Sequence, residues 1–172
     1  MDPHAAAALG MLDILQKMVE EDPDVVNQRG PDGQVPLHYA VSPEVIDLLL
    51  DHGADIDTRD IDHNSTPAQY AVNNPDKCRP FIERGAQTDI FMACKLGDIK
   101  LVRRILKEDP NALQAQVGKG DFTSGESNGG HIYEYNIGVA ARPLFLASRL
   151  GHEAITELML SYSLVEQKFL HA

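Results

Sequence analysis

The sequence predicts an all-α protein made of helix pairs that repeat along the chain and stack on one another. The first observation is a recurring order of signals. Residues 32–60 contain a turn, a Pro-containing helix start, an apolar helix and a Gly-Ala-Asp exit, and parts of this order return elsewhere. Self-similarity at a period of roughly 20–50 residues is typical of repeat architectures. The second observation is an alanine that follows each helix start. These alanines are Ala6, Ala40, Ala71, Ala93 and Ala147.

The third observation is a shared frame of helix, glycine turn and helix. The stretches that begin at Ala6, Ala93 and Ala147 keep the same spacing of apolar residues on both sides of a glycine. We expect each of these glycines to end a helix in the left-handed conformation, which glycine adopts without steric cost. The glycines are Gly10, Gly97 and Gly151.

The first two units are the most regular. An amphipathic outer helix is predicted over 11–21 and is stopped by Asp22-Pro23. A turn-containing connection, which we call a finger, follows this helix. Residues 30–33 form its tip, and Gly33 should have a positive φ. The second finger, 60–65, carries Asn64 at the corresponding position, and asparagine is the residue that best replaces glycine there.

The later units depart from this spacing. From Ala71 to Ala93 there are only 22 residues, which predicts that the third finger is missing, and from Ala93 to Ala147 there are 54, which predicts an insertion. In the third unit Pro80 falls inside the predicted outer helix, so we expect that helix to be short. The insertion, 114–141, begins Gly- and Ser-rich, and residues 132–137 alternate like a strand. This pattern predicts an enlarged finger, such as a β-hairpin.

These motifs resemble ankyrin repeats. The resemblance rests on Pro36-Leu37-His38 before Ala40, Thr66-Pro67, Gly151-His152 and Gly53-Ala54-Asp55, and it covers nearly the whole chain except about 114–141. It implies a solenoid of helix-turn-helix units with β-turn or hairpin fingers, and a structural histidine at His38. The expected units of this single domain are 4–34, 35–65, 66–88, 89–141 with the insertion, 142–165, and the start of a truncated unit in 166–172.

The resemblance also implies a non-catalytic scaffold for protein–protein interaction, with the partner on the concave surface of finger tips and inner helices. By position, the candidates on the two fingers are Arg29, Asp32, Gln34, Arg59, Asp62 and His63. Those on inner helices are Lys95 and Arg149. In the insertion, His131, Tyr133 and Tyr135 are candidate anchors, since aromatic residues with polar tips carry interface energy; packing on the next unit is the alternative.

Two other functions remain open at this point. The chain could be a regulatory or structural arm of a longer protein, since the last unit looks unfinished. It could also be an enzyme with a site in 117–138, although none of the available side chains forms a known catalytic spacing. Those side chains are Asp121, Ser124, His131, Tyr133, Glu134 and Tyr135. No cofactor or metal is predicted.

Composition limits the class of partner that the chain is expected to bind. The net charge is −11 and the pI about 4.9, which argues against nucleic acid and against an anionic membrane surface and favours a protein with a basic patch. Cys78 and Cys94 fall on predicted helices and are expected to be buried thiols in a reducing compartment, which indicates a cytoplasmic protein. We expect a monomer, with end-to-end association through the unfinished last unit as an alternative.

Overall fold

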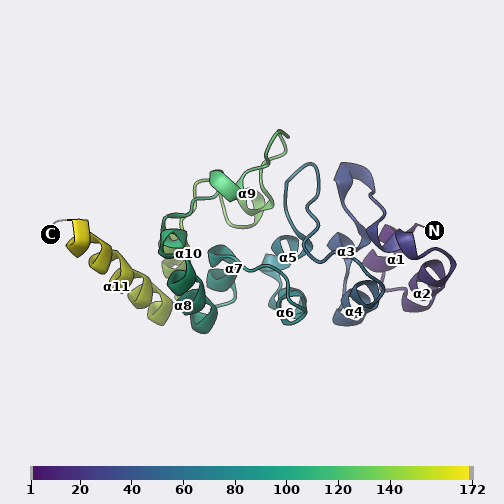
Figure 1. The fold of residues 1–172 in the computed structure, drawn as a ribbon, viewed down its shortest axis with the longest axis horizontal. Helices are drawn as coiled ribbons and strands as arrows, with labels where there is room; N and C mark the ends of the chain where they lie inside the picture. The colour runs from purple at the N-terminus through teal and green to yellow at the C-terminus, as the bar shows by residue number, and fades with distance from the viewer. Residues whose placement is uncertain (1, 171–172) are drawn as a thin grey trace. The chain divides into compact units, whose positions relative to one another are not determined.

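The computed structural model describes residues 2–170 and folds into two compact units. Unit 1 comprises Met1–Gln87 and Thr123–Ile132, and unit 2 comprises Thr88–Phe122 and Tyr133–Ala172. Helices and turns account for all the regular structure in the described residues (Figure 1), which confirms the predicted all-α class.

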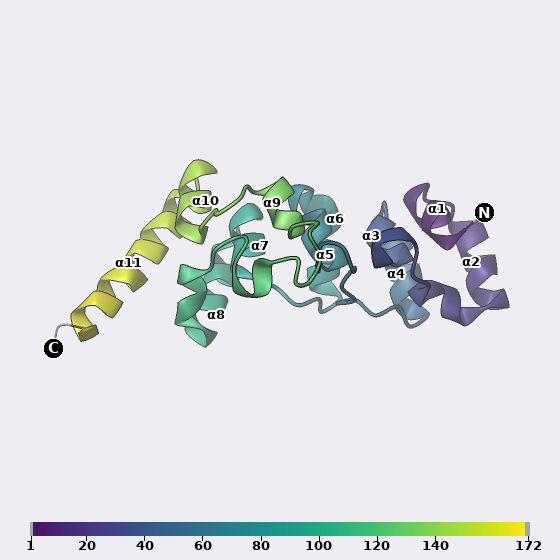
Figure 2. The same cartoon turned by 90° about the horizontal axis from the view of Figure 1, so that it is seen from above.

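Unit 1 contains three helix pairs in two layers. The inner helices are α1 (Pro3–Ala8), α3 (Pro36–Tyr39) and α5 (Pro67–Tyr70), and the outer helices are α2 (Leu12–Glu21), α4 (Pro43–Asp51) and α6 (Pro75–Glu83). Within this unit α1 packs on α3 and α3 on α5, while α2 packs on α4 and α4 on α6 (Figures 1 and 2). Fully buried side chains such as Leu15, Ile46 and Phe81 fill the space between the layers. Each pair therefore buries its apolar face on the next one.

Unit 2 contains two further pairs. Its elements are α7 (Ile90–Lys95), α8 (Ile99–Glu108), the 3₁₀ turns η4 (Pro110–Gln114) and η5 (Gly120–Phe122), α9 (Ile132–Asn136), α10 (Pro143–Arg149) and α11 (Glu153–Leu170). Inner helix α10 packs on α7, and outer helix α11 packs on α8. Residues 166–170 lie inside α11, whereas 171–172 are outside the described residues, so a further unit beginning at 166 stays a prediction.

Backbone geometry confirms the predicted turns. Gly10, Gly97 and Gly151 have φ values of 65°, 63° and 74°. Gly33 has φ 73° and Asn64 φ 50°, as expected for the two finger tips. The predicted absence of a third finger is also confirmed, because α6 ends at Glu83 and α7 begins at Ile90.

The prediction of a short helix around Pro80 is wrong. Helix α6 runs for nine residues, as many as α4, with Pro80 in its interior. The neighbours Cys78 and Phe81 are 0% and 1% exposed, so their burial fixes the helix. Packing therefore outweighs the hydrogen bond that proline cannot donate.

The prediction of a strand over 132–137 is also wrong, and no hairpin forms in the described part of the insertion. These residues form α9, in which the Ile137 amide donates to the Tyr133 carbonyl at 2.8 Å. Tyr133 and Ile137 are buried and Tyr135 is 69% exposed. The buried residues are four apart, which is the helical period, so the alternation of apolar residues was misleading.

Candidate functional site

The two fingers of unit 1 are joined to each other through their backbones. The carbonyl of Asp32 accepts hydrogen bonds from the amides of Ile61 (2.8 Å) and Asp62 (3.2 Å). The Arg29 guanidinium donates to the Gly33 carbonyl at 2.5 Å and to the Arg59 carbonyl at 3.0 Å. Arg59 repeats the first of these bonds by donating to the Asn64 carbonyl at 2.6 Å. Arg29 and Arg59 thus stabilise the fingers. The sequence had suggested them only as partner contacts.

A buried carboxylate organises the second finger. Asp60, 3% exposed, accepts hydrogen bonds from the Ser65 amide (2.8 Å), the His63 amide (2.9 Å) and the Tyr70 hydroxyl (2.9 Å). Burial and then the bond to Asp60 raise the pKa of Tyr70, so its hydroxyl keeps its proton. Gln34 donates to that same hydroxyl at 2.8 Å and is therefore also engaged within the fold.

His38 has the structural role that its motif predicted. Its Nδ1 accepts from the Val35 amide at 3.2 Å, so the ring is the tautomer whose Nε2 donates to the Ser65 carbonyl at 3.1 Å. Burial lowers the pKa of His38, which keeps the ring neutral. His4 occupies the same place one repeat earlier, with its Nε2 3.0 Å from the Gln28 carbonyl.

The insertion folds back onto the second finger. We call Thr123–Ile132 the strap. It belongs to unit 1 and lies beside the second finger in Figure 1. His63 Nδ1 donates to the Gly130 carbonyl at 2.7 Å and Asn64 donates to the Thr123 carbonyl at 3.2 Å. The Ile132 amide donates to the Ser65 hydroxyl at 3.2 Å. The strap therefore contacts three consecutive residues of the finger.

The strap takes the place that a third finger would have had. In the first finger, the Asp32 carbonyl bonds to the backbone of the next finger. Thirty residues on, the Asp62 carbonyl accepts from the Ser127 hydroxyl of the strap. A Cβ on Gly129 would lie 2.5 Å from the Asp62 carboxylate and 2.7 Å from its carbonyl, so this close approach requires glycine. The missing finger and the insertion, two separate irregularities of the sequence, are thus complementary.

His131 and Tyr133 are corrections to the list of partner anchors, because both are 0% exposed. Burial, followed by repulsion from Arg59, lowers the pKa of His131 to about 4, so the ring is neutral near pH 7. The Tyr133 hydroxyl donates to the Asp89 carboxylate at 2.8 Å, and its ring stacks on Phe122 at 6.0 Å between centroids. Both side chains are parts of the core.

The remaining candidates of unit 2 lie on or near α10. Arg149 is exposed, stacks on Phe145 with 5.5 Å from its guanidinium carbon to the ring centroid, and donates to the Ile137 carbonyl at 2.9 Å. Lys95 is half-buried, and this burial lowers its pKa. Tyr135 is 69% exposed and Phe145 59%. Arg149, Phe145 and Tyr135 are therefore exposed, whereas Lys95 is only partly so.

Sequence reasoning missed Ile61 at the tip of the second finger. This side chain is 66% exposed and lies over Gly33, where a Cβ would be 2.4 Å from Ile61 Cγ1. Together with nearby charged side chains it forms what we call the finger-tip surface. Its members are Arg29, Asp32, Ile61, Asp62 and, on the strap, Glu126. A signal existed, since an isoleucine between two aspartates in a turn is unusual for a solvated loop.

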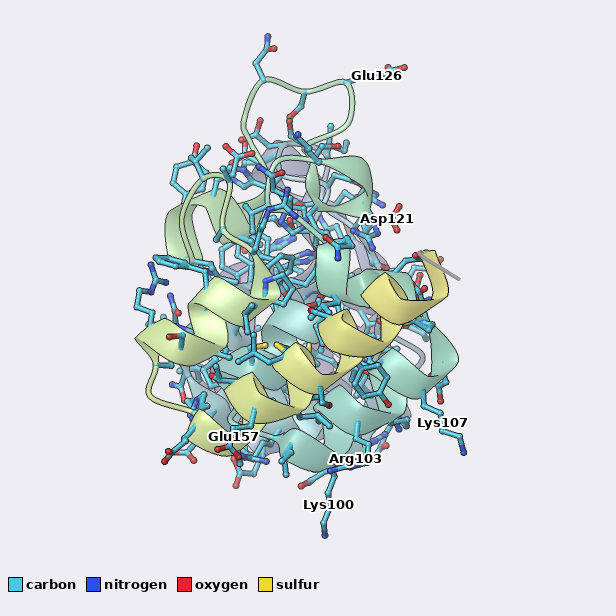
Figure 3. All side chains as sticks on the ribbon, turned by 90° about the vertical axis from the view of Figure 1, so that its left-hand side faces the viewer. Lys100, Arg103, Lys107, Asp121, Glu126 and Glu157 are labelled. Carbon is cyan, nitrogen blue, oxygen red and sulfur yellow. The ribbon has the colours of Figure 1, made fainter. Side chains whose placement is uncertain are left out.

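The acidic balance of the chain is confined to unit 1. This unit has 17 acidic and 6 basic side chains, a net −11, whereas unit 2 has nine of each. In Figure 3 Glu126 stands at the outer end of the strap, directed away from the ribbon. The finger-tip surface therefore lies on the unit that carries the negative charge.

Among residues 2–170, no group of three or more His, Cys, Asp or Glu side chains is placed to hold a metal ion. No helix in that range is long and apolar enough to cross a membrane. Cys78 and Cys94 are buried, as predicted, and neither takes part in a disulfide.

Stacked helix pairs, turns closed by left-handed residues and fingers tied through their backbones define a repeat protein of the helix-turn-helix type. The family model for ankyrin repeats (three copies) matches residues 4–91, just over half of the chain. The chain belongs to the ankyrin repeat family. Members of this family are typically not enzymes, and ankyrin repeats are generally protein–protein interaction modules.

Known relatives agree with this membership. Ankyrin repeat and SOCS box protein 6 of Pongo abelii is 35% identical over 78 residues, which are 42% of this chain and 18% of that protein. Protein fem-1 homolog A of Bos taurus is 39% identical over 85 residues, 39% of this chain and 13% of that protein. The human fem-1 homolog A is 37% identical over 99 residues, 44% and 15% respectively. The chain therefore spans less than a fifth of the length of each of these relatives.

Proposed function

We propose that this chain is a non-catalytic protein-interaction module whose partner binds the finger-tip surface of unit 1. The observation that carries the proposal is Ile61, a large apolar side chain that is 66% exposed among charged neighbours. The backbone beneath it is held by the first finger on one side and by the strap on the other. An exposed apolar residue on a rigid support is suited to binding, because little conformational entropy is lost on association.

The chemistry of the surface favours a basic partner. Asp32 accepts the Ile61 amide proton, Asp62 follows Ile61 in the chain, and Glu126 precedes Ser127, which donates to the Asp62 carbonyl. The whole excess of negative charge lies on unit 1. A partner with a basic patch around an apolar residue would complement this arrangement and would be steered to it. The module acts as a monomer in this proposal, and its two buried thiols support a reducing, cytoplasmic compartment.

The relatives support a place for the module within a longer protein. Each of these relatives is several times longer than the segment that aligns with this chain. The name of one of them combines ankyrin repeats with a SOCS box. We propose accordingly that this chain is the recognition arm of a larger protein.

A charge-reversal experiment tests the proposal. The tagged chain is used to capture partners from native lysate, alongside Asp32→Lys/Asp62→Lys and Ile61→Asp variants. The matched control is Glu21→Lys/Asp24→Lys, which makes the same charge change at exposed positions near the end of α2. We expect the finger-tip variants to lose the specific partner and the control to keep it. Equal retention by all variants would contradict the proposal.

No observation favours an enzyme with its site in the insertion. Burial removes His131 and Tyr133 from contact with any substrate. Ser124 donates its hydroxyl proton to the Ser127 carbonyl at 2.7 Å, inside the strap itself. The hydroxyl is thus used to shape the strap.

A further inference from the structure

Unit 2 contains a cavity that the finger-tip surface does not include. It has a volume of about 480 Å³ and lies among the start of α7, the end of α8, η4 and η5. Thr88 and Asp89, in the short connection that lacks a finger, also line it. Cavities of roughly 300–1,000 Å³ are the size that commonly holds ligands or side chains of a partner.

The cavity has an apolar floor. Ile90 is 2% exposed, and Ile105 and Phe122 are half-buried. Phe122 is held edge-on to Phe91 at 4.9 Å between centroids and stacked with Tyr133 at 6.0 Å. These ring contacts hold the floor in place, so it offers a fixed apolar surface on which a side chain of a partner can pack.

The rim is acidic. Glu108, Asp109 and Asp121 are exposed carboxylates that line the opening, and Lys119 is the one basic residue among the lining residues. In Figure 3 Asp121 projects from the ribbon toward solvent. Asp89 also lines the cavity, but its oxygens accept from the Tyr133 hydroxyl and the Met92 amide. Because unit 2 has nine acidic and nine basic residues, this negative rim is a local feature.

A lining that combines apolar side chains with three exposed carboxylates suits a side chain with an aliphatic stem and a cationic end. Lysine and arginine have this form, with methylene groups that pack on apolar surface while the charge stays near water. We propose that the cavity is a docking site for a lysine or arginine side chain, flanked by apolar residues, in an extended segment of a partner protein. The inference rests on the proposed role as a protein-interaction module and adds a second site, with its own chemistry, on unit 2.

Synthetic peptides test the inference on the intact chain. The probe is a capped Ala-Leu-Lys-Leu-Ala peptide, compared with peptides in which norleucine or glutamate replaces the lysine. Binding is followed by NMR through the methyl signals of Ile90 and Ile105, which line the cavity. We expect the lysine peptide to shift these signals and the glutamate peptide to leave them unchanged. Absence of shifts with the lysine peptide would overturn the inference.

Two variants of different kinds localise the site. Glu108→Lys/Asp121→Lys reverses the rim charge and should weaken binding about tenfold, because two attractions become repulsions. Ala115→Leu fills the cavity without a change in charge and should weaken binding as well. The control, Glu153→Lys/Glu157→Lys, makes the same charge change at exposed positions of α11 outside the lining (Glu157 is labelled in Figure 3) and should bind as the unaltered chain does. Equal weakening by the control would reduce the effect to general electrostatics and overturn the inference.

The finger-tip variant separates this inference from the proposed function. Asp32→Lys/Asp62→Lys should leave peptide binding at the cavity unchanged, since neither residue lines it. If partner capture is lost in the finger-tip variant but no peptide shifts the signals of Ile90 and Ile105, the cavity site is disproved and the finger-tip proposal stands. If the peptide binds but partner capture is the same with the finger-tip variant, the finger-tip proposal is disproved and the cavity site stands.

Discussion

At the scale of single residues, Gly129 is the point where the strap comes closest to the second finger. A Cβ there would be 2.5 Å from the Asp62 carboxylate and 2.7 Å from its backbone oxygen. We predict that Gly129→Ala destabilises the contact by about 1–3 kcal/mol, the usual cost of overpacking. Faster hydrogen exchange at the Ile132 amide, which donates to Ser65, would report the loss. Asn128→Ala, at an exposed neighbouring position, should leave that rate unchanged.

His131 gives the strap a dependence on pH. Its pKa is about 4 in the folded chain against 6.5 in an unfolded one, so below pH 6.5 the unfolded state binds the extra proton. The stability due to neutral His131 is therefore complete above pH 6.5 and is lost as the pH falls toward 4, by up to about 1.4 kcal/mol per pH unit. Arg59 and His63 add to this lowering, and Asp60 opposes it.

Urea unfolding of the intact chain near pH 7 and near pH 5 measures this effect. The His131→Gln variant, whose side chain takes no proton in this range, should lose less stability between the two conditions than the unaltered chain. Identical losses would show that another group is responsible.

At the scale of elements, α9 is attached by one of its two tyrosines. Tyr133 is fully buried against Phe91 and Phe122, whereas Tyr135, two residues later, is 69% exposed. We predict that Tyr133→Ala lowers the free energy of unfolding by about 3–5 kcal/mol. Tyr135→Ala should change it by less than about 0.5 kcal/mol. Thermal unfolding of the two variants provides the comparison, and similar losses would contradict the helical register of α9.

Helix α6 contains a second test at this scale. Pro80 cannot donate a hydrogen bond and stands in the interior of a nine-residue helix. We predict that Pro80→Ala stabilises the chain by about 1 kcal/mol, since alanine restores the donor but also frees the unfolded chain. A midpoint of urea unfolding that falls, rather than rises, would show that the ring itself packs usefully.

The elements also show how far sequence reasoning reached. Repeat spacing was sufficient to predict the helix pairs, the missing third finger and the left-handed conformations of Gly33 and Asn64, because each depends on local signals. It failed at residues 132–137, where alternation suggested a strand but burial follows the four-residue spacing of Tyr133 and Ile137. Spacing also gave no indication that the strap would bond to residues more than sixty positions earlier, such as His63 with Gly130. Long-range pairing of this kind depends on tertiary contacts that a local pattern does not contain.

The candidate site was predicted only in its general location. The fingers were expected to carry it, and Asp32 and Asp62 do lie at their tips. Arg29, Arg59 and Gln34 were expected to be available to a partner, but all three donate hydrogen bonds within the fold. Arg29 links the two fingers, Arg59 bonds within the second finger, and Gln34 bonds to Tyr70. Exposure patterns cannot separate these roles, because a polar side chain that binds a carbonyl and one that binds water look alike in sequence.

At the scale of the whole molecule, charge and irregularity coincide in unit 1. This unit holds the net charge of −11, both complete fingers and the strap that replaces the missing one. The replacement gives the second finger a partner on each side, as in an uninterrupted array. We infer that the insertion serves to keep the finger-tip surface in a single conformation, ready for association.

Hydrogen exchange on the intact chain, free and bound to the captured partner, tests the central claim most directly. If the partner binds the finger-tip surface, amides of residues 31–34, 60–65 and 124–130 should exchange more slowly in the complex. Amides of the outer helices α4 and α6 should be unaffected. Slowing confined to those outer helices, with the fingers and strap unchanged, would contradict the account.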